Sequence, residues 1–145
     1  RYHQTGTHQY HFAVTTHAEG WRNGYGFALG ESHPLYVCAK TSDGGAMEPV
    51  AGLMRVSDPL VAVSTVKKAD NEDCMVLRLC EMEGVDKDVT VTLPFDAVSV
   101  RRCNLVEEDL GPEESVNGNS ITVHLGHNAV ETVKVGFAPV PRQGF

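Results

Sequence analysis

The sequence lacks the motifs by which several classes of enzyme are recognised. Its 145 residues contain no GxSxG nucleophile elbow, no GxxxxGK[ST] phosphate loop and no CxxC pair. It also lacks a signal peptide and any apolar run long enough to cross a bilayer. We therefore expect neither hydrolase-elbow, phosphate-loop nor zinc-knuckle chemistry, and no membrane partner.

Positive charge is scarce as well. Twelve Lys and Arg residues face 19 Asp and Glu residues, which gives a net charge of −7, and the only basic pairs are Lys67-Lys68 and Arg101-Arg102. Nucleic-acid affinity comes mainly from clustered basic side chains, so we expect no nucleic-acid partner. Hydrophobic residues at 41% and charged residues at 21% are ordinary globular values, and the chain is long enough for one core.

The spacing of the four cysteines does not resemble that of a disulfide framework. They are widely separated along the chain, at Cys38, Cys74, Cys80 and Cys103. Two disulfides are compatible with this count, but scattered spacing is also typical of small buried thiols. We favour reduced cysteines.

The sequence does contain segments in which apolar and polar residues alternate with a period of two. Val89, Val91 and Leu93 share one face of a strand in DVTVTLP, opposite two threonines. Three further segments repeat this pattern: SITVHL at 120–125, ETVKVGF at 131–137 and CMVLRLCEM at 74–82. Turn signals separate them, and this rhythm predicts an all-β, antiparallel β-sandwich.

The pattern changes along the chain. No window predicts an amphipathic helix, and NGYGFALG at 23–30 is interpreted as a loop because neither a helix nor a lysine follows its glycines. The Gly-rich segment Thr41–Pro49 is interpreted as a connection between two blocks. We assign residues 1–50 to the end of a larger β domain, a supersandwich, and residues 51–145 to a small terminal β-sandwich.

The stretch TGTHQYHFAVTTH, at 5–17, is a candidate metal site because it holds three histidines. Its aromatic and β-branched residues favour a strand, in which His8 faces one side while His11 and His17 face the other. The three imidazoles then do not converge, and a metal would need ligands from elsewhere, such as His33 or His127. The alternative is a set of strand histidines without a metal.

Two further candidates involve sugar chemistry. Glycoside hydrolysis needs two carboxylates across the scissile bond, but the acidic residues here fall mostly in turns, where they are usually solvated. Trp21 and Tyr25 lie near a polar loop, where aromatic rings either stack on a sugar or anchor the loop by packing. From the residues alone, the chain is a β module without a visible active site.

The order of motifs resembles the C-terminal region of glycoside hydrolase family 38, the retaining α-mannosidases, especially the cytosolic and bacterial type. That family carries a segment similar to D-x-G-x-H-x-F-x-Y-x-L-x-P-H. Gln4 and Thr16 depart from it, at the usual Asp and Pro. The matching positions here are Gly6, His8, Tyr10, Phe12, Val14 and His17.

Four later segments resemble the family in the same order. ESHPL matches at Pro34 and Leu35 but has Glu31-Ser32 at the usual Leu-Asn. The segment at 58–84 is similar to a strand, a turn and the strand V-L-R-L-Y-E, with Arg78 at its Arg and Cys80 at the usual Tyr or Phe. CNLVEEDL and HNAVETVKVGF resemble the closing segments, so the resemblance covers 6–137.

This resemblance implies a non-catalytic C-terminal β region that supports the catalytic domain and its cleft. The family's nucleophile, acid/base carboxylate and zinc ligands lie in an N-terminal domain whose motifs do not occur here, so no residue is expected to be catalytic or to bind metal. The chain starts with RYHQTG, without an initiator Met, and we expect it to begin within a larger protein.

The implied cofactor is zinc in the intact enzyme and none in this region. The implied partners are the catalytic and helical domains of the same chain and a mannoside substrate, in the cytoplasm; formation of a homo-oligomer is left open. The alternative function is a free-standing carbohydrate-binding β-sandwich that contacts sugar through Trp21 and Tyr25.

Overall fold

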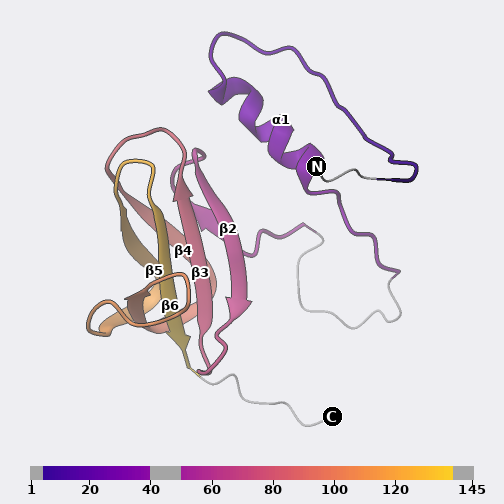
Figure 1. Ribbon diagram of the computed structural model, residues 1–145. Coiled ribbons are helices and arrows are strands. Elements are labelled where there is room, and N and C mark those ends of the chain that lie inside the picture. The colour runs from indigo at the N-terminus through magenta and orange to yellow at the C-terminus, as the bar shows by residue number, and fades with distance from the viewer. Residues whose placement is uncertain (1–4, 40–49, 139–145) are drawn as a thin grey trace. The chain divides into compact units, whose positions relative to one another are not determined.

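The computed structural model describes residues 5–39 and 50–138 (Figure 1). The chain divides into two units, Arg1–Ala46 and Met47–Phe145. The predicted connection Thr41–Pro49 and the motif residue Gln4 lie outside the described residues. The assignment of residues 1–50 to the end of a larger β domain stays a prediction.

The first unit contains one helix, α1 (Arg22–Ser32), and no strand in its described residues. The strand predicted within 5–17 is therefore wrong, because no neighbouring strand of this unit supplies the hydrogen bonds that a strand needs. The loop predicted at 23–30 is also wrong, since those residues lie inside α1. Apolar residues are only weakly segregated to one side of the helix, so the sequence shows no clear apolar stripe, and the helix buries no residue.

In the described parts of the chain, no helix is long and apolar enough to cross a membrane.

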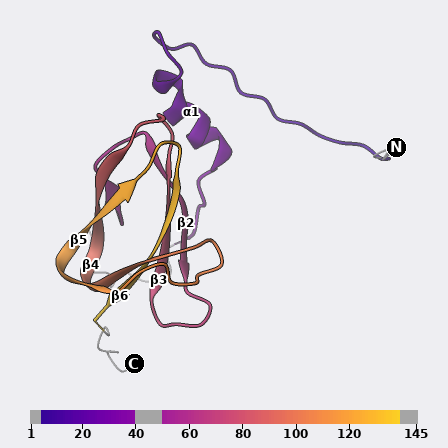
Figure 2. The ribbon, with the colours of Figure 1, turned by 60° about the vertical axis from the view of Figure 1, so that its left-hand side comes forward.

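The second unit is a curled, entirely antiparallel sheet (Figures 1 and 2). The strands are paired in the order β1-β4-β6-β3-β2, and β5 pairs with β4. The predicted all-β, antiparallel sandwich is confirmed. The strands are β1 (Arg55–Val56), β2 (Val61–Lys68), β3 (Met75–Glu81), β4 (Lys87–Cys103), β5 (Glu114–Leu125) and β6 (Val130–Phe137).

One hairpin, β4 with β5, belongs to both layers of the sandwich. The first part of β4 pairs with β1 and the end of β5, whereas its last part pairs with β6 and the start of β5. The register shifts between Thr92 and Ala97, around Pro94, which has no N–H to donate. Opposite this shift Gly118 has a φ of +99°, which side chains rarely adopt. The hairpin bends here and carries the chain from one layer to the other.

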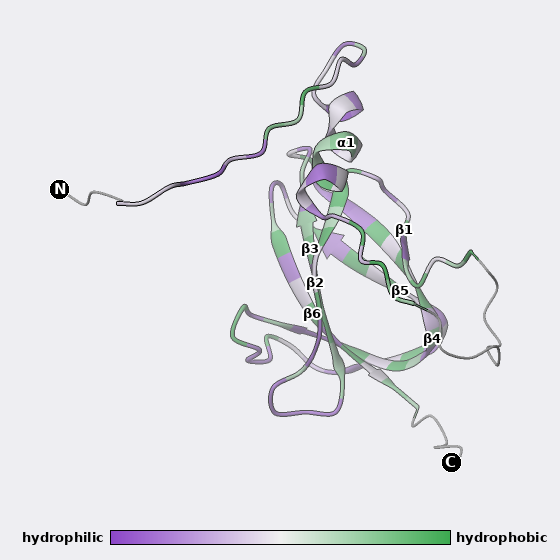
Figure 3. Ribbon diagram, turned by 90° about the vertical axis from the view of Figure 1, so that its right-hand side faces the viewer, coloured by the Kyte–Doolittle hydropathy of each residue, from purple (hydrophilic) through white to green (hydrophobic). Residues whose placement is uncertain are grey.

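The core lies between the two layers. Hydrophobic and hydrophilic residues alternate along the strands in Figure 3, and the inward positions of β4 and β5 predicted from the sequence are buried. All four cysteines are unpaired, and burial raises the pKa of the Cys74 and Cys103 thiols. The main core comprises Val61, Leu77, Leu79, Val89, Val91, Leu93, Ala97, Ile121, Val123, Leu125, Val133 and Val135.

Candidate functional site

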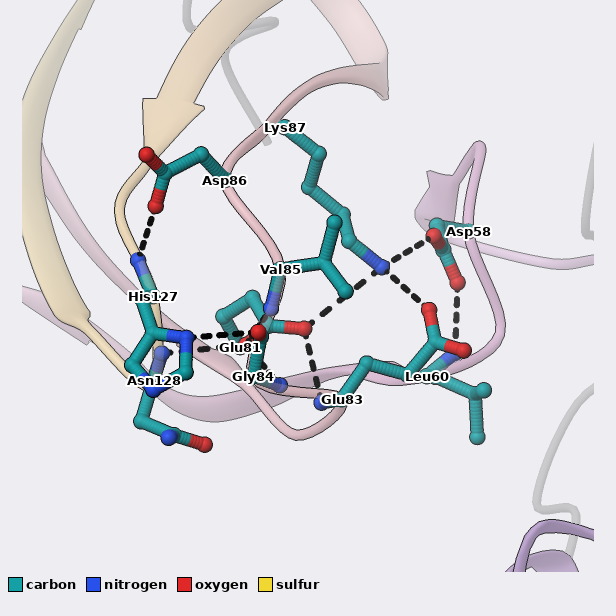
Figure 4. Close-up of polar contacts among 10 residues, drawn as sticks. All are labelled: Asp58, Leu60, Glu81, Glu83, Gly84, Val85, Asp86, Lys87, His127 and Asn128. Atoms are coloured by element: carbon teal, nitrogen blue, oxygen red, sulfur yellow. Dashed lines mark hydrogen bonds and ion pairs between the residues drawn. The ribbon is translucent and has the colours of Figure 1, made fainter.

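A buried carboxylate, that of Glu81, joins two loops at one end of the sandwich (Figure 4). Glu81 ends β3, and its Oε1 accepts the N–H of Glu83 at 2.7 Å. Its Oε2 accepts the N–H of Gly84 at 2.7 Å, that of Val85 at 3.2 Å and that of Asn128 at 3.1 Å. Asn128 belongs to the β5–β6 loop and the other three to the β3–β4 loop, so this one side chain fixes both loops.

These hydrogen bonds determine the ionisation of Glu81. Burial by itself raises the pKa of a carboxyl group, because it disfavours the charged form. The four backbone N–H donors outweigh burial and lower the pKa of Glu81 to about 2. The carboxylate is therefore charged at neutral pH and is used in holding the loops together.

Lys87, the first residue of β4, adds an ionic contact to the same cluster. Its Nζ lies 2.8 Å from Asp58 Oδ2, 2.7 Å from Glu83 Oε2 and 3.5 Å from Glu81 Oε1. Hydrogen bonds to Asp58 and Glu83 raise the pKa of Lys87, and the bond from Lys87 lowers the pKa of Asp58. Because every charge has an opposite partner, the cluster is suited to positioning loops.

A second ionic cluster lies around Lys134 of β6. Its Nζ contacts Glu72 and lies 2.9 Å from Asp109 Oδ1, and both carboxylates also contact Arg101. The hydrogen bond to Glu72 outweighs burial and raises the pKa of Lys134 to about 12. This cluster ties the β2–β3 turn and the β4–β5 loop to the sheet.

The two residues predicted to contact sugar line a common hollow in the first unit. Trp21 and Tyr25 meet edge to face, with ring centroids 6.1 Å apart. The hollow has a volume of about 480 Å³ and lies between α1 and the segment at 13–17. A Cβ on Gly24 would lie 2.7 Å from the His17 ring, so only glycine lets that imidazole pack against the helix. The volume is large enough for a sugar ring.

The remaining motif residues are dispersed. The rings of His8, Tyr10 and Phe12 follow one another at 6.4 and 6.5 Å, all in exposed residues, and Gly6 has a φ of +115°. Pro34 and the 95% exposed Leu35 follow α1. Arg78, in the second unit, donates from Nε to Thr132 Oγ1 at 3.1 Å and from Nη2 to the Leu105 carbonyl at 3.2 Å. The structural roles proposed for these residues stay predictions.

The described residues do not fit a metal. Among residues 5–39 and 50–138, no three His, Cys, Asp or Glu side chains are grouped so that they could hold an ion, and this includes His8, His11 and His17. The carboxylates of the two clusters are occupied by Lys87, Lys134, Arg101 and backbone amides. We therefore assign the zinc implied by the family resemblance to none of these residues.

The two ionic clusters are absent from the sequence-based predictions. A signal for Glu81 does exist, because it lies in phase with Leu77 and Leu79 and so falls at an inward position of its strand. A charge in a core position needs partners. Its partners on the β5–β6 loop are more than 40 residues away in the chain, and no local pattern points to them.

Together these features define a β-sandwich domain whose buried charges bind its own loops. The comparison with family models identifies it further. Residues 60–133, just over half of the chain, match the model of the glycosyl hydrolases family 38 C-terminal beta sandwich domain. The chain belongs to this family and contains a non-catalytic region of a family 38 glycosidase. No curated protein matches the chain.

Proposed function

We propose that the chain is the C-terminal region of a retaining, zinc-dependent α-mannosidase, in which it supports the catalytic domain and shapes its cleft. The observation that carries this proposal is the family match over 60–133, which falls within the sandwich formed by β1–β6. The ordered motifs at 6–137 support the mannosidase specificity. The proposed partners are the catalytic and helical domains, and the proposed location is the cytoplasm.

The ionic clusters support a scaffolding role. A surface that holds another domain in place needs loops with one conformation, since ordering them on contact costs free energy. Glu81 and Lys134 each fix two segments that connect strands, and they are 4% and 6% exposed. The charged groups find their partners within the sandwich, Glu81 on backbone N–H groups and Lys134 on two carboxylates, which leaves the loops fixed before any partner binds.

The proposal is tested by an activity comparison. We expect the 145-residue chain to leave an aryl α-mannoside intact with Zn²⁺ or Co²⁺ present. The complete polypeptide that contains it should hydrolyse the α-mannoside, lose activity with a chelator, and release mannose with retained anomeric configuration by NMR. An aryl α-glucoside is the matched substrate control. Hydrolysis by the 145-residue chain alone, or an inverted product, would contradict the proposal.

A second candidate function, carbohydrate binding, is favoured by the hollow that contains Trp21 and Tyr25. Aromatic rings beside a hollow of this size can stack on a sugar. Titration calorimetry with methyl α-mannoside tests it. Binding that disappears in Trp21→Ala but persists in Tyr36→Ala, a 95% exposed aromatic residue outside the hollow, would favour this function. Absence of heat with the unmodified chain would exclude it.

A further inference from the structure

A hollow in the sandwich itself reaches down to the core. It has a volume of about 370 Å³, and its lining includes Val100 and the core residues Val123 and Val133, which are 4% and 2% exposed. Leu110 and Pro112 of the β4–β5 loop also line it. This volume lies in the range of small-molecule pockets, and the apolar floor suits an apolar body.

The wall made by the β4–β5 loop is held in place by the sheet. The N–H of Leu110 donates to the Arg102 carbonyl at 2.9 Å. The neighbouring Asp109 pairs with Cys103 as an isolated bridge, and its carboxylate receives Lys134 at 2.9 Å and Arg101 at 3.2 Å. The hollow is therefore formed before a ligand arrives, which reduces the cost of binding.

The polar side chains around the hollow are mainly basic, although the whole chain carries a charge of −7. Arg101, Arg102 and His124 line it, and Glu114 is the acidic residue in its described lining. The carboxylates that pair with Arg102 and His124, those of Glu131 and Asp88, do not line the hollow. The lining thus presents two guanidinium groups and one carboxylate, and the carboxylate that pairs with Arg102 is not part of the lining.

Arg102 has donors available for a ligand. Its Nε and Nη2 both donate to the same oxygen, Glu131 Oε2, at 3.2 and 2.7 Å. A guanidinium has five N–H donors, so these two bonds leave others, and the side chain is 57% exposed. His124 contacts Asp88 Oδ1 through Nδ1 at 2.8 Å; in the tautomer that donates from Nδ1, Nε2 is an acceptor, so this ring supplies no donor to the hollow. Arg101 differs, because both of its terminal nitrogens contact Glu72 or Asp109.

We propose that this hollow binds a carboxylate carried on a small apolar body. The carboxylate accepts from the unused donors of Arg102, and the apolar body lies against Val100, Val123 and Leu110. A neutral apolar molecule would gain binding free energy only from the apolar floor of the hollow. An inorganic anion would gain it only from the basic side chains. The hollow therefore favours a ligand that has both an apolar part and a carboxylate.

The test uses a pair of probes that differ in charge. Amide chemical shifts of the ¹⁵N-labelled chain are followed during titration with sodium benzoate or benzamide. We expect both to shift Val100, Thr122 and Val133, and benzoate to bind about tenfold more tightly because its contacts are charge-assisted. Equal affinity for the two probes, or shifts scattered away from the hollow, would overturn the proposal.

Two variants change the selectivity in opposite directions. Arg102→Gln should reduce the benzoate preference to about twofold or less, whereas Glu114→Gln should tighten benzoate about twofold by removing a like charge. Arg55→Gln, on β1, is the matched control and should leave the preference unchanged. A preference retained in a folded Arg102→Gln variant, or lost in Arg55→Gln, contradicts the assignment. If Arg102→Gln does not fold, the sign of the Glu114→Gln effect decides.

A peptide pair distinguishes the natural sources of such a carboxylate. The blocked peptides Leu-Glu-Leu and Leu-Gln-Leu present the same two chemistries on a polypeptide. A Glu peptide that shifts the same amides and binds more tightly than benzoate supports an acidic side chain as the source. Weaker binding of the Glu peptide than of benzoate supports a small organic acid. If benzoate and both peptides fail to shift these amides, the proposal is wrong.

Discussion

The two units of the chain reach secondary structure by different routes. In the second unit, strands that are distant in sequence pair and bury a core of twelve apolar residues. In the first unit, α1 buries none of its 11 residues, and the described residues are nearly all exposed. Isolated helices of this length are marginal in water. The second unit therefore carries the stability of the chain, while the first depends on local contacts.

The largest effect should separate the two units by their response to loss of a leucine side chain. Leu79 is fully buried in β3, and Leu35 is 95% exposed after α1. Leu79→Ala should lower the free energy of unfolding by about 2–5 kcal/mol, because it removes buried methyl groups and leaves a cavity. Leu35→Ala should change it by less than about 0.5 kcal/mol. Urea unfolding of the whole chain measures both.

If Leu35→Ala lowered the free energy of unfolding as much as Leu79→Ala, Leu35 would be buried in the folded chain. The contrast between the two units would then not hold.

The next effect concerns the buried charge. Glu81→Gln should lower Tm by on the order of 10 °C. The variant places an amide NH₂ where a carboxylate oxygen accepts hydrogen bonds from backbone N–H groups, and two donors then face each other. The pKa of Glu81 is lowered from 4.5 to about 2. Its stabilisation is thus fully present above pH 4.5 and is lost as the pH falls toward 2. Thermal unfolding between pH 2 and 7 should show a weaker pH dependence in the variant.

Asp96→Asn, an exposed acid on the same sheet, is the matched control. It should change neither Tm nor its pH dependence. If Glu81→Gln unfolds at the same temperature as the unmodified chain, the carboxylate does not hold the loops.

Most strands could be predicted from the sequence, because alternation survives wherever one face of a strand is buried. Val89, Val91 and Leu93 illustrate this, since each is buried as the period of two requires. The length of β4 could not be predicted. Its alternation is interrupted at Pro94, and only the changed pairing shows that one strand continues into the second layer.

The helix and the clusters escaped prediction for different physical reasons. Helix α1 contains Gly24, Gly26 and Gly30, which lower helix propensity, and it has no apolar stripe. Lys134 lies at an outward position of an alternating strand and is nevertheless buried, because Glu72 and Asp109 from two loops cover it. Such long-range pairs leave no local pattern. The hollow near Arg102 depends on the β4–β5 loop, which carries Asp109.

A smaller effect tests the bend that forms two layers from one hairpin. Gly118→Ala should cost about 1–2 kcal/mol of stability, since its φ of +99° is strained for a residue with a Cβ. Gly111→Ala is the matched control, because its φ is not positive and no atom lies within 4 Å of the added Cβ. Denaturant unfolding compares them. Equal stability of both variants would show that the bend does not depend on this conformation.

The smallest effect lies in the first unit and should differ between two glycine positions of α1. Gly26→Ala meets no atom within 4 Å, so it should stabilise α1 by about 0.5–1 kcal/mol through a lower entropy cost of folding. Gly24→Ala gains the same propensity but places its Cβ 2.7 Å from the His17 ring, which must move. Helix content by circular dichroism should therefore rise in Gly26→Ala, while the His17 ring resonances shift only in Gly24→Ala. Unchanged His17 resonances in Gly24→Ala would show that the imidazole does not pack on the helix, and the hollow beside Trp21 would then lack one wall.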